Sequence, residues 1–206
     1  GIPVSVITDC DVRPYDIDPM TKEKAFSEKE AESAQAEEEK NLKYTNGAVH
    51  GFTSPRWTLE YCIAMSCLSE DFHKAVHYGK KILNARDHIS LTNEKIDEAN
   101  QKVIEEAQQW HGLSQAEIAY RIYDLMLNGD GKSSLKAIVA QCLASVLRWK
   151  TSILPDGITQ EKMFDLDLYR LRTDGQKTSE LKSELESDRF LRYIVDAIKY
   201  AAGENV

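Results

Sequence analysis

The sequence predicts an α/β protein with a few strands near its N-terminus and a predominantly helical remainder. Three observations lead to this class: a β-branched run at the start, a second strand-like segment near residue 50, and apolar residues at three- and four-residue spacing thereafter. With 42% hydrophobic and 29% charged residues among 206, the composition is that of a soluble globular protein. No transmembrane run and no signal-peptide pattern are found, so we expect a cytoplasmic protein that does not contact a membrane.

The first predicted strand, residues 2–8, leads directly into Asp9-Cys10-Asp11. Alternate residues of an extended chain lie on one side, about 6–7 Å apart, so the two carboxylates would face the same way. Like charges at this spacing repel unless a cation lies between them. Carboxylate oxygens are ligands that Mg²⁺ and Mn²⁺ prefer, so Asp9 and Asp11 are predicted to ligate such an ion. Because the chain begins inside this strand, we expect it to be a piece of a longer protein.

Residues 12–40 are polar, and their second half is rich in Ala, Glu and Lys without an apolar stripe. This part is predicted to be either a solvated helix or a linker. Residues 42–52 resemble a strand interrupted by the turn pair Asn46-Gly47. Ser54-Pro55 has the composition of a helix start, which places Glu60 in the first turns of that helix.

The rest of the chain is predicted to be mainly helical, with a charged segment over residues 159–188. The clearest helix should bury one face through Leu135, Val139, Cys142 and Val146. A final helix should place Leu191, Ile194, Val195, Ile198 and Ala202 on one side and end at Gly203. The clearest helix is expected over residues 133–149, and the other predicted helices cover residues 70–85, 93–110 and 114–127. We expect two regions, residues 1–70 around the metal site and a helical region over residues 71–206.

Three further patterns are given structural interpretations. His73 and His77 are one helical turn apart, but without an H-E-x-x-H pattern we expect them on a helix surface. Residues 127–133 resemble part of a phosphate-binding loop, but a helix precedes them, so a helix-to-helix connection is expected. The four cysteines lack C-x-x-C spacing and are expected to be reduced, buried thiols.

Two motifs together resemble a known family. Thr8-Asp9-x-Asp11 after a strand, followed by S-P-x-x-T-L-E-Y at residues 54–61, is similar to the overcoming-lysogenization-defect family of ATP-dependent nucleases. The likeness is to the C-terminal part of their Toprim catalytic domain, so the strands would form part of a Toprim-like sheet. Weaker likenesses are K-x-x-x-A-Q-x-L-A at residues 136–144 and the closing segment 192–198. Many relatives carry a second acidic residue where this chain has Cys62.

This resemblance implies a metal-dependent DNA endonuclease that uses two Mg²⁺ or Mn²⁺ ions, in a larger ATPase-nuclease used in anti-phage defence. Asp9, Asp11 and Glu60 would hold the ions, and Lys136 would neutralise charge on the phosphate, with Lys132 as the rival lysine. ATP and a further catalytic glutamate are expected only on the missing upstream half. Expected partners are DNA, that upstream half, further copies of the protein, and a helicase-type or other defence protein.

Two other functions compete with this one. Another Toprim activity, of the topoisomerase or primase kind, lacks a zinc pattern or a tyrosine nucleophile context here. A non-catalytic helical interaction module would suit the net charge of −8 and the many helices, but leaves Asp-x-Asp unexplained. The negative charge also argues against a broad basic nucleic-acid surface, although it allows a metal nuclease whose positive charge is supplied by ions.

Overall fold

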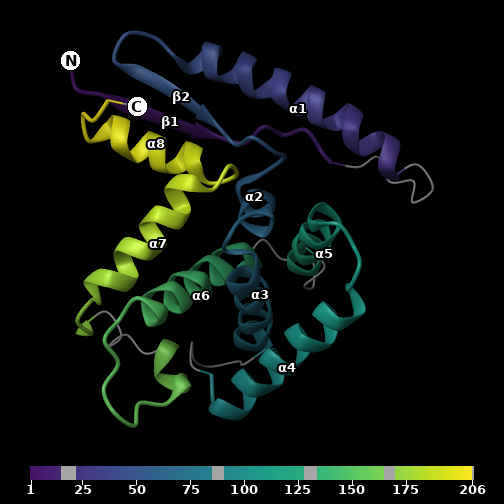
Figure 1. Ribbon diagram of the computed structural model, residues 1–206, viewed down its shortest axis with the longest axis vertical. Helices are drawn as coiled ribbons and strands as arrows, with labels where there is room; N and C mark the ends of the chain where they lie inside the picture. The colour runs from purple at the N-terminus through teal and green to yellow at the C-terminus, as the bar shows by residue number, and fades with distance from the viewer. Residues whose placement is uncertain (15–21, 85–90, 128–133, 165–169, 206) are drawn as a thin grey trace. The chain divides into compact units, whose positions relative to one another are not determined.

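The computed structural model describes residues 1–14, 22–84, 91–127, 134–164 and 170–205 (Figure 1). It is mostly helical, with a small parallel sheet near the N-terminus, as the sequence predicts. Within these residues, no helix is both long and apolar enough to span a bilayer. The elements are β1 (Val4–Thr8), α1 (Lys22–Tyr44), β2 (Val49–Thr53), α2 (Leu59–Met65), α3 (Ser69–Asn84), α4 (Asn93–Gln109), α5 (Gln115–Leu127), α6 (Ser134–Lys150), η1 (Gln160–Phe164), α7 (Gly175–Ser187) and α8 (Arg192–Ala201).

The chain forms two compact units. Residues 1–67 and 184–206 make one, and residues 68–183 make the other. The division near residue 67 lies close to the boundary expected from the sequence. Residues 184–206, which the sequence assigned to the helical region, cluster instead with the N-terminal residues.

In the first unit, β1 and β2 pair in parallel, from Val4 opposite Val49 to Thr8 opposite Thr53. Helix α1 makes the crossover connection that two parallel strands require. It runs along β2, and α8 lies against both strands (Figure 1). A two-stranded sheet is marginal in water, so helices that cover it are needed for its stability.

Successive strand residues point to opposite faces of the sheet, and a different helix covers each face. Gly51 meets α1 so closely that a Cβ there would be 3.0 Å from the Asn41 carbonyl oxygen. On the other face, the Ser5 hydroxyl donates to the Ala197 carbonyl of α8 at 2.5 Å. Phe52 forms a small core on that face with Tyr193 and Ala197.

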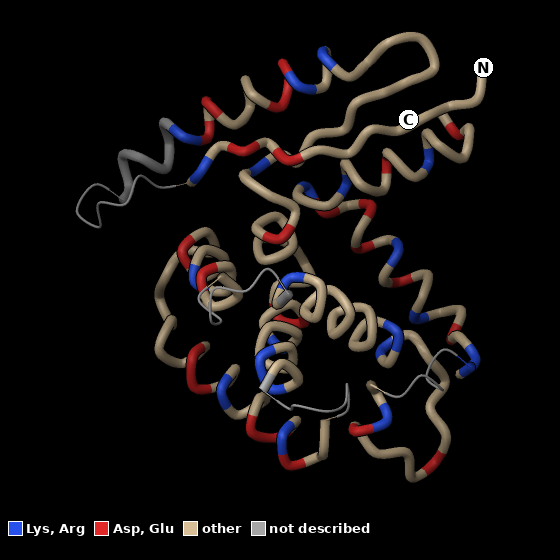
Figure 2. The backbone as a smooth tube through the Cα atoms, turned by 180° about the vertical axis from the view of Figure 1, so that it is seen from behind, with Lys and Arg blue, Asp and Glu red and all other residues tan. Residues whose placement is uncertain are grey.

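Helix α1 is the solvated helix that was one of the two alternatives for the polar stretch. Acidic and basic residues follow one another along it (Figure 2). Among its residues 29–44, Ser33 alone is buried. Residues 29–44 of the helix therefore contribute little to a core beyond their contact with β2.

Two boundaries expected around β2 are wrong. Residues 42–44 end α1, and Asn46-Gly47 turns from that helix into β2, with Gly47 at φ +60°. The short apolar alternation before the turn belonged to the last turn of the helix. The next helix begins at Leu59, because Thr58, and not Ser54, caps it by accepting from the Tyr61 amide at 3.3 Å.

The buried face of α8 agrees only in part with the expected one. Leu191 is buried and Ile194 packs against the core of Phe52, Tyr193 and Ala197, but Ile198 is 63% exposed. Gly203 ends the helix at φ +82°, as expected. Several hydrophobic stripes can be drawn on this short helix, and its contact with Phe52 decides which one is buried.

The second unit is built around α3, which packs against α4, α5 and α6. The helix expected over residues 133–149 is confirmed as α6, and Leu135, Val139, Cys142 and Val146 are all buried. The helices expected over residues 70–85, 93–110 and 114–127 are likewise found as α3, α4 and α5. Most of the expected phosphate-loop-like connection, residues 128–133, lies outside the described residues, as does Lys132. The charged segment contains η1 and α7.

Candidate metal centre

The carboxyl ends of β1 and β2 lie together because the two strands are parallel and in register at Thr8 and Thr53. The Asp-x-Asp sequence follows β1 directly. Residues 54–58 follow β2 and lead into α2, whose second residue is Glu60. In open α/β sheets, ligands characteristically bind at this carboxyl edge.

Backbone hydrogen bonds continue past the strands and join the two segments. The Ser54 amide donates to the Thr8 carbonyl at 2.9 Å, and the Asp11 amide donates to the Trp57 carbonyl at 2.8 Å. Between them, the Ser54 hydroxyl accepts from the Cys10 amide at 2.8 Å and is fully buried. Ser54 therefore holds the Asp-x-Asp loop, which is a different role from the helix cap expected.

Asp9 is oriented by the start of α2. Its Oδ1 accepts from the backbone N–H of Leu59 at 2.9 Å, and Glu60 is the next residue along. Two carboxylate residues separated by about fifty positions thus come to one place in the fold. The sequence could place each at the end of a strand or the start of a helix, but it could not give this bond.

Asp11 is held in an unusual conformation. Its φ is +67°, in the left-handed region that aspartate tolerates better than most residues. Its Oδ2 accepts from Lys40 of α1 at 2.5 Å, and the same ammonium donates to the Asp9 carbonyl oxygen at 2.6 Å. Lys40 thus supplies a positive charge beside the Asp-x-Asp sequence.

Lys40 is a residue that sequence reasoning missed. It lies 29 positions from Asp11 in an acidic helix, and no motif marks it. Only the crossover path of α1 between two parallel strands brings its side chain to this edge.

Tyr193 of α8 is the second missed residue. It is 9% exposed, and its hydroxyl has no hydrogen-bond partner among the described atoms. Burial raises the pKa of this phenol, and the nearby Cys62, Asp9 and Glu60 raise it further. The Tyr193 hydroxyl is therefore a buried donor without a described partner, within the electrostatic influence of Asp9 and Glu60.

Cys62 does not replace the acidic residue found in many members of the resembled family. It is fully buried, and burial raises the pKa of its thiol to about 12. Its Sγ lies 3.2 Å from the Arg56 carbonyl, to which it donates. A neutral thiol in this position is a poor ligand for Mg²⁺, so the candidate ligands stay the three carboxylates.

The three predicted metal ligands differ in how closely the structure ties them to one another. The Asp9 carboxylate accepts from the amide of Leu59, the residue before Glu60, and Asp11 lies in the same loop as Asp9. Within the described residues, the one group of three metal-binding side chains whose ligand atoms all lie within 4.8 Å is elsewhere, at His73, His77 and Glu106. Convergence of Asp9, Asp11 and Glu60 on a shared ion stays a prediction.

Lys136 belongs to the other unit. It is an exposed residue of α6, and its Nζ lies 5.9 Å from the centre of the Tyr123 ring. Its proposed role at the phosphate therefore rests on the family resemblance alone.

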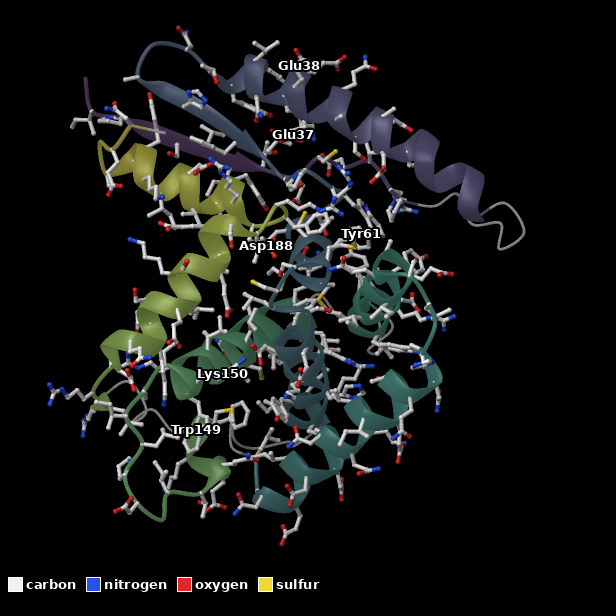
Figure 3. All side chains as sticks on the ribbon, viewed as in Figure 1. Glu37, Glu38, Tyr61, Trp149, Lys150 and Asp188 are labelled. Atoms are coloured by element: carbon white, nitrogen blue, oxygen red, sulfur yellow. The ribbon has the colours of Figure 1, made fainter. Side chains whose placement is uncertain are left out.

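A hollow of about 390 Å³ in the first unit does not include the three carboxylates. It is lined by residues of α1, by Thr45 and by His50, with Glu37 and Glu38 among them (Figure 3). Partial burial raises the pKa of Glu37. This hollow is therefore separate from the candidate centre.

Comparison of the chain with protein-family models, with curated proteins and with solved structures found no match. The class that the structure itself defines is a parallel β–α–β unit with an acidic loop after its first strand, joined to a helical unit.

Proposed function

We propose that this chain is the C-terminal part of the Toprim-like catalytic domain of a metal-dependent DNA endonuclease. The observation that supports the proposal is the bond from the Leu59 amide to Asp9, which ties the Asp9 carboxylate to the residue before Glu60 at the carboxyl end of two parallel strands. The buried hydroxyl of Tyr193, which has no hydrogen-bond partner among the described atoms and whose pKa is raised by the charges of Asp9 and Glu60, adds support.

Asp9, Asp11 and Glu60 hold Mg²⁺ or Mn²⁺ in this proposal. Such ions lower the pKa of a bound water and stabilise the leaving oxygen of a phosphodiester. The chain's own contribution is orientation: the Leu59 amide fixes Asp9, and the Trp57 carbonyl fixes the backbone of Asp11. Tyr193 supplies a donor for a phosphate or water oxygen, and Lys136 or Lys132 supplies a positive charge.

The resemblance to the overcoming-lysogenization-defect family extends this proposal to the whole protein. An upstream half would contribute an ATPase and a further catalytic glutamate, and DNA would be the substrate. Self-association and a role in anti-phage defence belong to the same proposal. We expect the present chain alone to be weakly active or inactive, because a two-metal site that lacks a ligand loses affinity and geometry.

Metal binding by the present chain is the direct test. Mn²⁺ should raise the melting temperature, because an ion that binds only the native state stabilises it. Asp9→Asn and Glu60→Gln should each remove this effect, and Glu38→Gln, an exposed acidic residue of α1, is the matched control. Equal stabilisation in all four proteins would contradict the proposed site and favour the helical interaction module.

Nicking of plasmid DNA by the complete protein tests the chemistry. Asp9→Ala and Glu60→Ala should abolish Mg²⁺- or Mn²⁺-dependent nicking. Lys136→Ala should slow it by about 10²–10³-fold without loss of metal binding, by analogy with single charge-stabilising donors. Full activity in Asp9→Ala would remove the nuclease assignment, and full activity in Lys136→Ala with loss in Lys132→Ala would transfer the role to Lys132.

A further inference from the structure

The second unit contains a buried cluster that the proposed nuclease chemistry does not use. His73 and His77 lie one turn apart on α3, and Glu106 comes from the neighbouring α4. Their side chains are 5%, 11% and 19% exposed, respectively. The expected helix-surface position of the two histidines is therefore wrong: α4 covers the face of α3 that carries them.

The three side chains converge on one point. The Nε2 atoms of His73 and His77 lie 2.6 Å and 2.8 Å from the same oxygen, Oε2 of Glu106. Trp110, one turn after Glu106, stacks on His73 with 4.9 Å between ring centres and thereby fixes that imidazole plane. Two nitrogens and one oxygen thus face each other with little freedom to turn away.

These distances are close to those of a tetrahedral metal site. Zinc bonds of about 2.0–2.1 Å to nitrogen and oxygen separate neighbouring ligand atoms by about 3.3 Å. To admit an ion, His73 and His77 would need to move away from the glutamate oxygen by only about 0.7 Å and about 0.5 Å, respectively. The same contacts form a hydrogen-bonded triad when no ion is bound, so the residues are held in place in both states.

The donor set selects the kind of ion. Imidazole nitrogen suits Zn²⁺ and its neighbours in the transition series, whereas Mg²⁺ prefers oxygen ligands throughout. Two histidines and one glutamate are also a known set of three zinc ligands that leaves a fourth position for water or another group. Lys80, on the same face of α3, acts electrostatically on His73 and Glu106. Its positive charge lowers the affinity for a cation but leaves the three ligands in place.

We propose that His73, His77 and Glu106 bind one zinc-type divalent ion, separate from the carboxylate centre, which ties α3 to α4. The proposal goes beyond the nuclease assignment and does not depend on it. Its elements all lie in the unit formed by residues 68–183.

Zinc titration of the metal-stripped chain tests this proposal. Calorimetry should give one Zn²⁺ per chain that is lost in His77→Gln and Glu106→Gln. At a Zn²⁺ concentration about a hundredfold above the dissociation constant, the melting temperature of the unchanged chain should rise by about 5–10 °C. His111→Gln, an exposed histidine just beyond Trp110, is the matched control and should bind as the unchanged chain does.

Asp9→Asn separates the two sites. It should keep the zinc effect while losing the Mn²⁺ effect, so the two proposals can fail independently. Loss of Zn²⁺ binding in Asp9→Asn together with its retention in His77→Gln would place the ion at the carboxylate loop and overturn the proposal. Absence of Zn²⁺ binding by the unchanged chain would also overturn it.

A spectroscopic measurement guards against variants that fail to fold. Co²⁺ bound to the unchanged chain should show the intense visible bands of four-coordinate cobalt, and Cu²⁺ should show nitrogen hyperfine coupling from two imidazoles. Octahedral cobalt bands or an oxygen-only copper signal would contradict ligation by the histidines, whatever the variants do.

Discussion

Among single residues, Lys40 has the most unexpected position. Its ammonium contacts both residues of the Asp-x-Asp sequence, through the Asp11 carboxylate and the Asp9 carbonyl. The repulsion between the two carboxylates, which from the sequence called for a cation, is therefore already reduced by a side chain. Any metal ion that uses Asp11 competes with this ammonium.

Lys40→Met should consequently tighten Mn²⁺ binding. The side chain of Asp11 is 73% exposed, so the competing pair is weak and the expected gain is about two- to fivefold in affinity. Calorimetric titration measures it. Lys43→Met, three residues along α1, is the control and should leave the affinity unchanged. Weaker binding in Lys40→Met would instead make Lys40 a residue that orients the loop.

Asp188, like Lys40, connects two segments that are far apart in the sequence, here through hydrogen bonds of its carboxylate. Its Oδ2 accepts from the Cys67 amide at 2.7 Å, and its Oδ1 accepts from the amides of Phe190 and Leu191 at 2.8 Å and 3.1 Å (Figure 3). It thereby joins the residue after α2 to the start of α8. Partial burial, followed by the charge of Asp188, raises the pKa of the exposed Cys67 thiol to about 11.

Cys67 should therefore alkylate slowly although it is exposed. A raised pKa means less thiolate, so at pH 8 the rate should be on the order of a hundredfold below that of free cysteine, rising as the pH approaches 11. Asp188→Asn should speed the reaction several-fold, because it removes the charge that disfavours the thiolate. Glu184→Gln, a weaker influence, should change the rate less. Mass spectrometry of the modified peptide gives the rate, and an unchanged rate in Asp188→Asn would contradict this account.

At the scale of elements, the contact between α3 and α6 depends on a small residue. A Cβ at Gly79 would lie 2.9 Å from Cγ2 of Val139, closer than real Cβ atoms approach. Glycine weakens a helix interior by about 0.5–1 kcal/mol relative to alanine, so its presence here is explained by the close approach of the two helices.

Gly79→Ala should destabilise the helical unit by about 1 kcal/mol, because overpacking exceeds the gain in helix propensity. Adding Val139→Ala should relieve the clash, so the double variant should be about 1 kcal/mol more stable than the sum of the single effects. Urea unfolding measures each free energy. Gly175→Ala is the control, because a Cβ at Gly175 would meet no atom within 4 Å, and it should not lower the free energy of unfolding. If the free-energy changes of the two single variants simply add in the double variant, the two helices can move apart at no cost and the proposed clash is contradicted.

At the scale of the whole molecule, one unit is continuous in sequence and the other is not. Residues 68–183 form the continuous unit, whereas residues 1–67 need 184–206 to complete theirs. The dependence is specific: α8 supplies Tyr193 and Ala197, which bury Phe52 of β2.

A chain ending at residue 183 should therefore lose the order of the sheet unit and keep the helical one. Without Tyr193 and Ala197, the small apolar core around Phe52 is exposed. The fluorescence of Trp57 should shift to that of a solvent-exposed tryptophan. The fluorescence of Trp110 and Trp149 should still report a cooperative thermal unfolding transition, with a melting temperature within about 5 °C of that of the full chain. Variants that retain one tryptophan each separate the signals. Loss of the helical transition as well would show that residues 68–183 do not fold alone.

The sequence by itself determined the helices of the second unit and the strand end and helix start that carry Asp9, Asp11 and Glu60. Helix periodicity is local, so α3 to α6 follow from a few consecutive turns, and the buried face of α6 follows with them. A strand that ends in Asp-x-Asp and a helix start that contains Glu60 are also local features.

Contacts between distant residues were decided only by the tertiary structure. The bond from Leu59 to Asp9, the position of Lys40 and the packing of Tyr193 all join segments 29 or more residues apart. The burial of His73 and His77 depends on α4 covering them, which their own helix does not indicate. Local spacing fixes which side chains share a face, whereas the partner that covers the face depends on how the whole chain packs.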